Sequence, residues 1–132
     1  MAEQTFEGGC LCGRIRYRAT GRPARSHYCH CRMCQRGVGS VLTAWLDLPL
    51  EGFAWSGDEP AWYRSSPDLR RGFCPTCGAS ICTLPDGDDH IWLTIASLDD
   101  PEQISPTFHM WTSSRVSWLE IADELPRHDG QA

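Results

Sequence analysis

The stretch Cys74-Pro75-Thr76-Cys77-Gly78 has the form C-P-x-C-G, with two thiols separated by a short turn. The proline stiffens that turn, and the glycine permits the tight backbone that lets amide N–H groups face the sulfurs. Two sulfurs presented in this way are half of a structural zinc site, because such a site is closed by four protein ligands. The fold therefore depends on which other part of the chain supplies the second pair.

Cys10-Leu11-Cys12 supplies two further thiols, and the two pairs together make a site of four thiolates. Residues 13 to 73 lie between them, so one zinc ion would tie the first strand of the chain to a late hairpin. A structural zinc stabilises small peptides by about 10–16 kcal/mol at neutral pH, which exceeds the stability of an ordinary domain. Removal of this zinc is therefore expected to damage the fold.

A third cluster, Cys29-His30-Cys31-Arg32-Met33-Cys34, brings three more thiols close together. Their spacing indicates a second zinc site with Cys29, Cys31 and Cys34 as ligands. Three protein ligands are typical of a catalytic zinc, which keeps one position open, whereas a fourth would make the site structural. The sequence leaves the fourth ligand open among Cys82, His27, His30, His109 and an exchangeable solute.

Each candidate for that fourth position also has an ordinary interpretation. Cys82 lies in a strand-like segment, where a free cysteine is commonly a small buried apolar residue. His30 stands between two ligands. We expect it to face away from the metal, or to contact a metal ligand without binding the metal itself. His27 and His90 are expected at the surface. His109 has aromatic neighbours that indicate partial burial.

Sulfur ligands also restrict the chemistry of a zinc site. Three thiolates make the ion a weak Lewis acid and a poor generator of hydroxide, whereas zinc hydrolases favour histidine and carboxylate ligands. A sulfur-rich site is better suited to a further soft ligand, such as a substrate thiolate. An open site in the third cluster therefore favours chemistry at sulfur over hydrolysis.

The composition is that of a soluble protein in a reducing compartment. The 132 residues are 41% hydrophobic and 22% charged, and no apolar run approaches the roughly 20 residues of a membrane span. The N-terminus lacks the basic and apolar regions of a secretory signal, so we expect a cytoplasmic protein. Seven of the eight cysteines fall into the three clusters, which in that compartment indicates metal ligation and not disulfides.

The length fits one domain. We expect a single zinc-binding domain over residues 1–126 and a polar C-terminal tail over residues 127–132 that frays. The net charge is −5, with twelve arginines and no lysine. A chain of that balance is a poor candidate for binding the phosphate backbone of nucleic acids. The sequence does not determine the oligomeric state.

Short strand-like segments separated by turns with proline and glycine predict an all-β domain. Arg14 to Ala19 alternates strictly, which places its apolar residues on one face. Helical signal is confined to a turn or two at Met33 to Arg36 and at Trp118 to Asp123. An antiparallel sandwich or open barrel follows from the further strand-like segments 41–46, 53–55, 62–65, 69–73, 80–84 and 91–98.

Together these residues resemble the glutathione-dependent formaldehyde-activating enzyme family, also called S-(hydroxymethyl)glutathione synthase-like proteins. Gly8 to Gly13 with Arg16-Tyr17 is similar to the family's opening GGCxCGxxRY, and Cys29 to Arg36 to its CHCxxCRR-type centre. Phe73 to Gly78 matches its FCxxCG. The resemblance runs from about residue 6 to residue 126. Its last part consists of Pro106, His109, Ser114, Trp118 and Asp123-Glu124-Leu125-Pro126.

The resemblance implies a β-tent fold, an all-β arrangement of antiparallel sheets, with two zinc ions as cofactors. The implied ligands of the structural zinc are Cys10, Cys12, Cys74 and Cys77. The implied ligands of the catalytic zinc are Cys29, Cys31 and Cys34. The family's founding activity joins glutathione and formaldehyde into S-hydroxymethylglutathione, formally a carbon–sulfur lyase run in reverse. Two positions depart from the family, because Gln35 stands where Arg is common and Cys82 where a larger apolar residue is common.

The leading hypothesis is a zinc-dependent lyase-type enzyme that joins or cleaves a thiol such as glutathione and a small aldehyde such as formaldehyde. Glutathione carries two carboxylates, so Arg36, just beyond the last ligand, is a candidate substrate contact. The alternative is a non-catalytic module with both zinc sites closed, which a fourth ligand at Cys82 would support. A redox switch built on the clustered thiolates is a third and more general interpretation.

Overall fold

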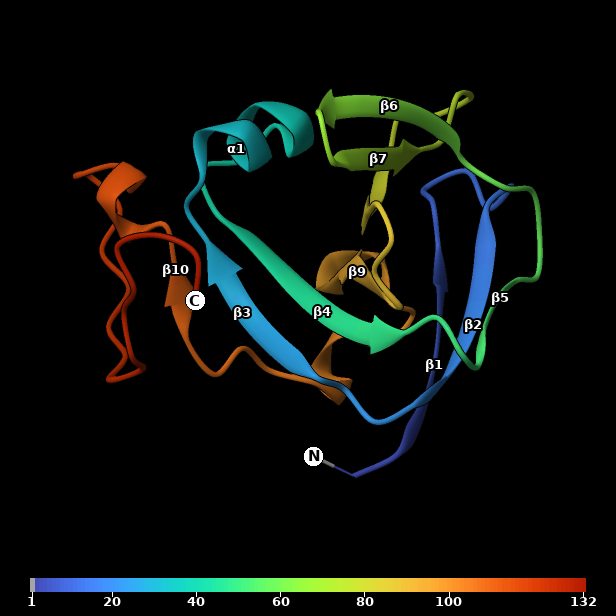
Figure 1. Cartoon of the computed structure of the whole chain (residues 1–132), viewed down its shortest axis with the longest axis horizontal. Helices are drawn as coiled ribbons and strands as arrows, with labels where there is room; N and C mark the ends of the chain where they lie inside the picture. Colours follow the sequence, from blue (N-terminus) through green and yellow to red (C-terminus); the bar gives the residue numbers. More distant parts are fainter. Residues whose placement is uncertain (1) are drawn as a thin grey trace.

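The computed structural model describes residues 2–132, and strands dominate it (Figure 1). They form two sheets. The three-stranded sheet has the antiparallel order β1 (Gln4–Gly9), β2 (Arg16–Gly21) and β5 (Phe53–Trp55). The seven-stranded sheet has the order β10 (His109–Met110), β3 (Arg25–Cys29), β4 (Thr43–Pro49), β9 (His90–Thr94), β8 (Ser80–Pro85), β7 (Leu69–Phe73) and β6 (Ala61–Ser66).

The predicted all-β fold with antiparallel sheets is confirmed. One pairing in the large sheet differs, because the short strand β10 runs parallel to β3. β10 belongs to the C-terminal segment, which follows the free edge of β3 in the same direction (Figure 1). The predicted segments 53–55 and 69–73 coincide with β5 and β7, whereas the segment 91–98 leaves the sheet after Thr94 in a 3-10 turn, Ile95–Ser97.

The helical predictions divide into one that is confirmed and one that is wrong. A short helix, α1 (Arg32–Val38), covers the predicted turn at Met33 to Arg36. Residues 118–123 instead follow an irregular path. Leu119 and Ile121 there point their apolar surface at a cavity and not at a helix partner. Two more 3-10 turns complete the chain, Pro101–Gln103 and Thr112–Ser114.

The main core lies between the two sheets. Cross-strand partners share a face of a sheet, so Leu46, Leu93 and Cys82 face the same side. That side meets Tyr17 of the small sheet and Ile15, the residue just before β2, and all five residues are fully buried. Each fully buried side chain of the size of leucine stabilises the fold by about 1.5–3 kcal/mol. The alternation predicted for Arg14 to Ala19 is thereby confirmed.

The opposite face of the large sheet carries a different set of residues. The register pairs Asp47 with Trp92, Trp92 with Thr83 and Thr83 with Arg71, so these four share that face. A second cluster of buried residues gathers around Trp45, two residues before Asp47. The helix α1 lies beside the ends of β3 and β4 (Figure 1). This face therefore differs in polarity from the core face.

The sequence analysis predicts that the C-terminal residues 127–132 fray. In the structure they pack against the sheet. His128 and His109 share a backbone hydrogen bond of 3.0 Å, and Arg25 donates to the carbonyl of Ala132 at 2.6 Å. The backbone N–H of Trp111 also donates to the carbonyl of Gly130 at 3.1 Å. These hydrogen bonds hold the segment against the sheet although its residues are polar.

The helices described in residues 2–132 lack the length and apolar character that a membrane crossing needs.

Candidate metal centres

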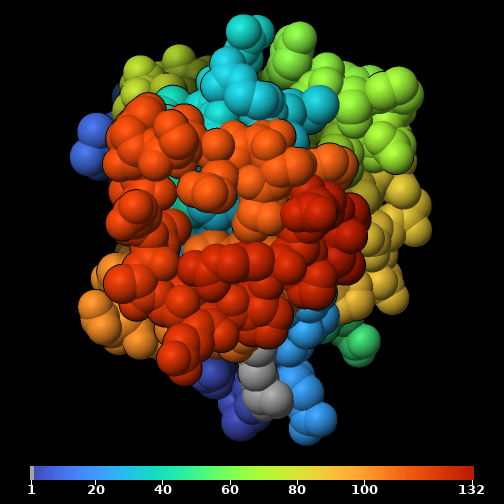
Figure 2. Space-filling model, turned by 90° about the vertical axis from the view of Figure 1, so that its left-hand side faces the viewer, coloured from blue at the N-terminus to red at the C-terminus, as the bar shows by residue number. Residues whose placement is uncertain are grey.

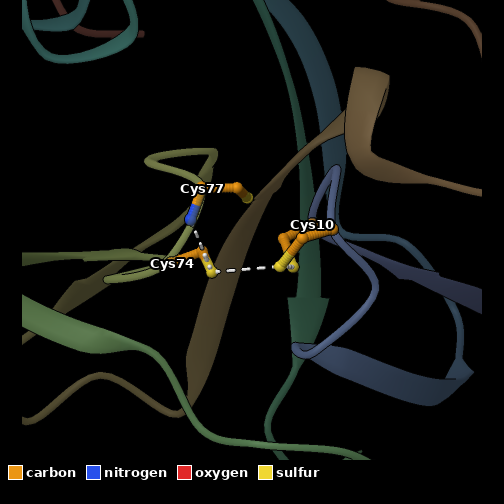
Figure 3. Close-up of side chains that lie close together, drawn as sticks. Cys10, Cys74 and Cys77 are labelled. Carbon is orange, nitrogen blue, oxygen red and sulfur yellow. Dashed lines mark hydrogen bonds between the residues drawn. The ribbon is translucent and has the colours of Figure 1, made fainter.

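Four sulfurs converge where the loop after β1 meets the turn between β7 and β8 (Figure 3). The Sγ atoms of Cys10, Cys12, Cys74 and Cys77 all lie within 4.8 Å of one another. The Sγ–Sγ distances are 3.5 Å for Cys10 and Cys12 and 3.7 Å for Cys12 and Cys74. A tetrahedral zinc with Zn–S bonds of about 2.3 Å places its sulfurs about 3.8 Å apart. The predicted convergence is confirmed, and the spacing fits one zinc ion.

Both cysteine pairs are presented by turns that require glycine. Gly13 and Gly78 have φ values of +83° and +79°, in the left-handed region that favours glycine. Their N–H groups donate to the carbonyls of Cys10 and Cys74 at 3.2 and 2.8 Å. The turns aim further backbone N–H groups at the sulfurs, at 3.2 Å from Cys10 Sγ and 3.4 Å from Cys74 Sγ. Such contacts stabilise the thiolates that a metal requires.

The thiols of this group do not ionise alike. Hydrogen bonds from the backbone, that of Ala79 foremost, lower the pKa of Cys77 to about 6. The backbone N–H of Arg14 favours the Cys12 thiolate, but burial and the neighbouring thiols outweigh it and raise the pKa of Cys12 to about 11. Four sulfurs this close cannot all be negative unless a cation shares the space. A zinc ion is the cation that the geometry fits.

The cysteine triplet spans the junction between β3 and α1. Cys29 is the last residue of β3, Cys31 is the N-cap residue of α1, and Cys34 is in its first turn. The Sγ atoms of Cys29 and Cys34 are 3.7 Å apart, again close to the about 3.8 Å expected across a tetrahedral zinc. Cys31 is the more exposed residue, and within residues 2–132 the three sulfurs do not all lie within 4.8 Å. The Cys29 and Cys34 sulfurs are therefore close enough to share one metal ion, whereas the three-ligand zinc site stays a prediction.

A buried arginine that the sequence analysis did not single out contacts this triplet. Arg71 on β7 is 9% exposed, and its Nη2 lies 3.5 Å from Cys34 Sγ. Its Nε donates to Ser65 Oγ at 3.1 Å, whereas Nη1 has no hydrogen-bond partner among the described residues. The contact with Cys29 and the charge of Arg71 lower the pKa of Cys34 to about 6. The same contact with Cys34, together with burial, raises the pKa of Cys29.

The sequence feature that could have identified Arg71 is the alternation of β7, because neighbouring residues of a strand face opposite sides of the sheet. Arg70 turns to the core side and stacks on Trp62, with its guanidinium carbon 4.6 Å from the ring centre. Which of the two arginines faces the triplet depends on strand register, which the sequence does not show. Arg36, the predicted substrate contact, has an exposed side chain in the last turn of α1 and stays a prediction.

Cys82 lies in the main core, away from the triplet. It is fully buried and shares its face of the sheet with Gly72 and Leu93, whereas Arg71 is on the other face. Burial raises the pKa of Cys82 to about 12, so its thiol stays neutral. The structure therefore supports a small buried apolar role for Cys82 and not a ligand of the second metal.

Cys82→Ala is expected to keep the zinc content of the wild type, because its sulfur is not a member of the group of four and lies on the sheet face opposite Arg71. Loss of the small buried side chain is expected to lower the free energy of unfolding by about 1–2 kcal/mol. Mass spectrometry of metals in the purified variant checks the zinc content, and thermal unfolding checks the stability. A variant with one zinc ion fewer than the wild type would show that Cys82 is a ligand.

Two histidines beside the triplet form a buried hydrogen-bonded chain with an acid. His30 Nε2 lies 2.9 Å from His109 Nδ1, and His109 Nε2 lies 3.0 Å from Asp123 Oδ2. Arg127 completes the chain by donating to Asp123 Oδ1 at 2.8 Å. The hydrogen bond from His109 lowers the pKa of Asp123 to about 2, and burial lowers the pKa of His30. His109 is 1% exposed, so the burial predicted for it is complete.

His27 corrects the sequence interpretation, which placed it at the surface. It is 1% exposed and stacks on Phe108 with ring centres 5.3 Å apart, because β3 is covered by the C-terminal segment. Burial lowers the pKa of His27 to about 4. His90 is more exposed, and its Nδ1 pairs with Asp89 at 2.7 Å. In the described part of the chain, neither histidine groups with the triplet sulfurs.

Two cavities adjoin the triplet, although its cysteines do not line them. The larger cavity, of about 620 Å³, includes Val38 at the end of α1 and Thr43, the strand partner of Cys29. The smaller cavity, of about 460 Å³, lies under the C-terminal segment and includes His30. Figure 2 shows a hollow on that side, ringed by orange and red atoms, with blue atoms of the earlier chain at its floor. Both cavities could admit a substrate.

Comparison with solved structures identifies a similar fold. A crystal structure of a Rhodobacter sphaeroides protein superposes with a TM-score of 0.57 and 18% sequence identity, covering 76% of this chain and 91% of that chain. At that identity the likeness concerns the fold alone. No curated protein matches the chain.

A family model described as glutathione-dependent formaldehyde-activating enzyme matches residues 5–114. The match includes all seven clustered cysteines together with Arg71 and His109, and Asp123 lies beyond it. The resemblance drawn from the sequence is thereby confirmed. Because the model covers most of the chain and both cysteine groups, this protein belongs to the glutathione-dependent formaldehyde-activating enzyme family.

Proposed function

We propose that the protein joins a thiol such as glutathione to a small aldehyde such as formaldehyde, or cleaves the product, at a zinc ion held by Cys29, Cys31 and Cys34. Family membership supports this pair of substrates. The observation that carries the proposal is the contact of Arg71 with Cys34, beside a second sulfur 3.7 Å away. Glutathione is a principal thiol of the cytosol, so we also propose a cytoplasmic location.

The proposed reaction forms one carbon–sulfur bond without any oxidant or reductant. The thiol loses its proton, its sulfur attacks the aldehyde carbon, and the carbonyl π electrons move to oxygen. That oxygen then takes up a proton, so RSH and H₂C=O become RS–CH₂–OH. Cleavage is the same sequence reversed. A bound zinc ion would supply the positive charge that keeps the thiol deprotonated near neutral pH.

Arg71 is proposed to act on two groups in this step, the ligand sulfurs and the aldehyde oxygen. Its Nη2 faces Cys34 Sγ at 3.5 Å, so its charge offsets that of the ligand sulfurs. Its Nη1 is buried and has no hydrogen-bond partner among residues 2–132, and we propose that the aldehyde oxygen of a bound substrate supplies one as it becomes negative. The hydrogen bond from Nε to Ser65 holds the guanidinium in this orientation. Arg71 is therefore proposed to stabilise the charge that develops on the aldehyde oxygen.

Aromatic side chains keep water from this centre. Trp45 is 2% exposed, and Trp92 and Trp111 pack against the cluster that it forms with Cys29 and Cys34. Trp111 has a φ of +57°, a strained conformation for a bulky residue that costs about 1–3 kcal/mol. The surrounding contacts must maintain that strain. An environment of low dielectric strengthens the interaction of Arg71 with negative charge.

The alternative of a closed, non-catalytic module requires a fourth protein ligand. Cys82 lies on the other face of the sheet. In residues 2–132, no histidine or carboxylate joins Cys29 and Cys34 in a group within 4.8 Å, and the third proposed ligand, Cys31, does not form such a group with them either. This arrangement supports a site with room for an external ligand.

A screen of thiols against aldehydes on zinc-loaded protein tests the proposal. With glutathione and ¹³C-labelled formaldehyde, NMR exchange spectroscopy measures how fast S-hydroxymethylglutathione forms and dissociates. We expect exchange faster than in buffer, and only with the zinc-loaded protein. If a folded protein with its full zinc content accelerates no thiol–aldehyde pair, the proposal fails.

Arg71→Met is expected to lower kcat by about 100-fold, the typical effect of losing one donor to a developing oxyanion. KM for the thiol should change less, because the guanidinium acts on charge that forms during the reaction. Arg70→Met is the matched control, since that arginine faces the other side of the same strand. Steady-state rates of the two variants decide the point, and equal rates would remove Arg71 from the reaction.

A further inference from the structure

The smaller cavity contains a buried hydrogen-bond acceptor that the proposed reaction does not use. His30 is 6% exposed and lines this cavity. Its Nε2 is bonded to His109 at 2.9 Å. Its Nδ1 has no partner in the described part of the chain, and it is not among the side-chain atoms sealed from solvent. That nitrogen therefore opens to the cavity.

The hydrogen-bond chain determines which nitrogen of His30 accepts. Asp123 is held as a carboxylate by Arg127 and only accepts, so the facing Nε2 of His109 carries a hydrogen. When His109 is neutral, its Nδ1 is an acceptor and the Nε2 of His30 donates to it. This leaves a lone pair on His30 Nδ1. A ligand that meets His30 must therefore offer a donor, such as an ammonium or a hydroxyl group.

Two charged side chains of opposite sign also line this cavity. Arg115 and Glu120 are both exposed, and neither has an ion-pair partner among residues 2–132. The other arginine of the lining, Arg127, is already bonded to Asp123. The cavity thus offers one free cation, one free carboxylate and one buried acceptor. This set complements a ligand that carries a carboxylate and an ammonium together.

The larger cavity lacks such a set. Its two charged residues, Arg16 and Asp99, are bonded to each other, with Nη1 donating to Oδ1 at 2.8 Å. Apart from Cys10, the rest of its lining is apolar or carries a hydroxyl group. A zwitterionic ligand therefore finds its complement in the smaller cavity.

We propose that the smaller cavity binds the zwitterionic α-amino-acid end of the thiol substrate. The carboxylate would contact Arg115, and the ammonium would lie between His30 Nδ1 and Glu120. The γ-glutamyl residue of glutathione has such an end. The identity of the ligand rests on the proposed function, whereas the complementarity of the cavity does not.

The position of the cavity beside the triplet supports this assignment. His30 stands between two triplet cysteines in the chain, and Thr112 lines the cavity next to Trp111. Trp111 in turn packs against the cluster of Cys29 and Cys34. A molecule held by its end in the cavity could therefore extend its sulfur toward the triplet.

Binding of S-methylglutathione to zinc-loaded protein tests the assignment, because its sulfur cannot ionise while its α-amino-acid end is intact. Arg115→Met and Glu120→Gln are each expected to weaken binding about tenfold, the loss of one charge-assisted hydrogen bond. The exposed residues Arg22 and Glu51 provide matched controls. Arg22→Met and Glu51→Gln should alter the affinity less than about twofold. Isothermal titration calorimetry measures all four variants.

A blocked ligand identifies the ammonium contact. N-acetyl-S-methylglutathione has no ammonium and is expected to bind the wild type about tenfold more weakly, with no further loss in Glu120→Gln. The assignment is overturned if S-methylglutathione does not bind, or if Arg115→Met binds it like the wild type, even when glutathione and formaldehyde are turned over. Expected binding without any turnover would instead retain the cavity and reject the proposed reaction.

Discussion

Cys74→Ser is expected to be unfolded under conditions in which the wild type is folded. Cys74 is 1% exposed, and its sulfur belongs both to the main core and to the group of four cysteines. A structural zinc contributes about 10–16 kcal/mol in small peptides, whereas whole domains are stable by only about 5–15 kcal/mol. Loss of one of four sulfur ligands removes most of that contribution. No other contact between the two sheets is expected to replace it.

The position of the site explains why the effect is global. Cys10 and Cys12 follow β1 of the small sheet, and Cys74 and Cys77 follow β7 of the large sheet. A metal there joins the two layers that enclose the main core. Amide NMR spectra and circular dichroism should therefore show a disordered chain for Cys74→Ser. Cys82→Ala is the control, since it removes a buried thiol that lies outside the group.

Chelation of the wild type gives an independent measure of the same site. We expect one zinc ion to leave with the fold intact and the other only as the protein unfolds. Metal release and circular dichroism recorded together should therefore show two steps. A folded Cys74→Ser variant with the thermal midpoint of the wild type would mean that apolar burial alone holds the two sheets together.

Local spacing was sufficient to predict the cysteine groups. The pairs Cys10-Leu11-Cys12 and Cys74 to Cys77 each lie within one turn, so their members cannot separate when the chain folds. Alternation was likewise sufficient for the buried face of β2. The strand β3 was not predicted, because Arg25, Ser26 and His27 are polar although two of them are fully buried. Burial of β3 comes from the C-terminal segment, which its own sequence does not reveal.

The residues that surround the triplet depend on long-range placement. Arg71 reaches Cys34 because the register across β7 and β8 turns it, and not Arg70, toward that face. The chain of His30, His109 and Asp123 requires the C-terminal segment to dock on β3. Spacing along the chain contains neither fact. The cysteine groups were therefore accessible from the sequence, whereas the residues that surround them were not.

Cys34→Ser is expected to lose the triplet zinc and to lower kcat/KM for thiol and aldehyde at least about 100-fold, since loss of even an outer partner of a metal ligand costs 10- to 100-fold. The fold should survive, because this site lies outside the main core. Cys34 is 8% exposed, and its replacement leaves Arg71 without its sulfur contact. A loss of about 1–3 kcal/mol in the free energy of unfolding is expected from that change.

Cys31→Ser provides a second variant with a smaller structural cost. Cys31 is the N-cap residue of α1 and makes no side-chain capping hydrogen bond, and serine is among the preferred residues at that position. The helix should therefore begin as before, or more stably, while one ligand sulfur is lost. Zinc content, circular dichroism and turnover measured on both variants separate folding from catalysis.

The combination of results decides between a catalytic and a structural triplet. Folded variants that lack one zinc ion and turnover would place the reaction at Cys29, Cys31 and Cys34. Full turnover in a folded Cys31→Ser variant would remove the triplet from the mechanism, because its ligand set would be incomplete. Unfolding of Cys31→Ser, at a half-buried position where serine suits the backbone, would show that the second metal is structural. The proposed enzyme therefore depends on a loss of activity without a loss of fold.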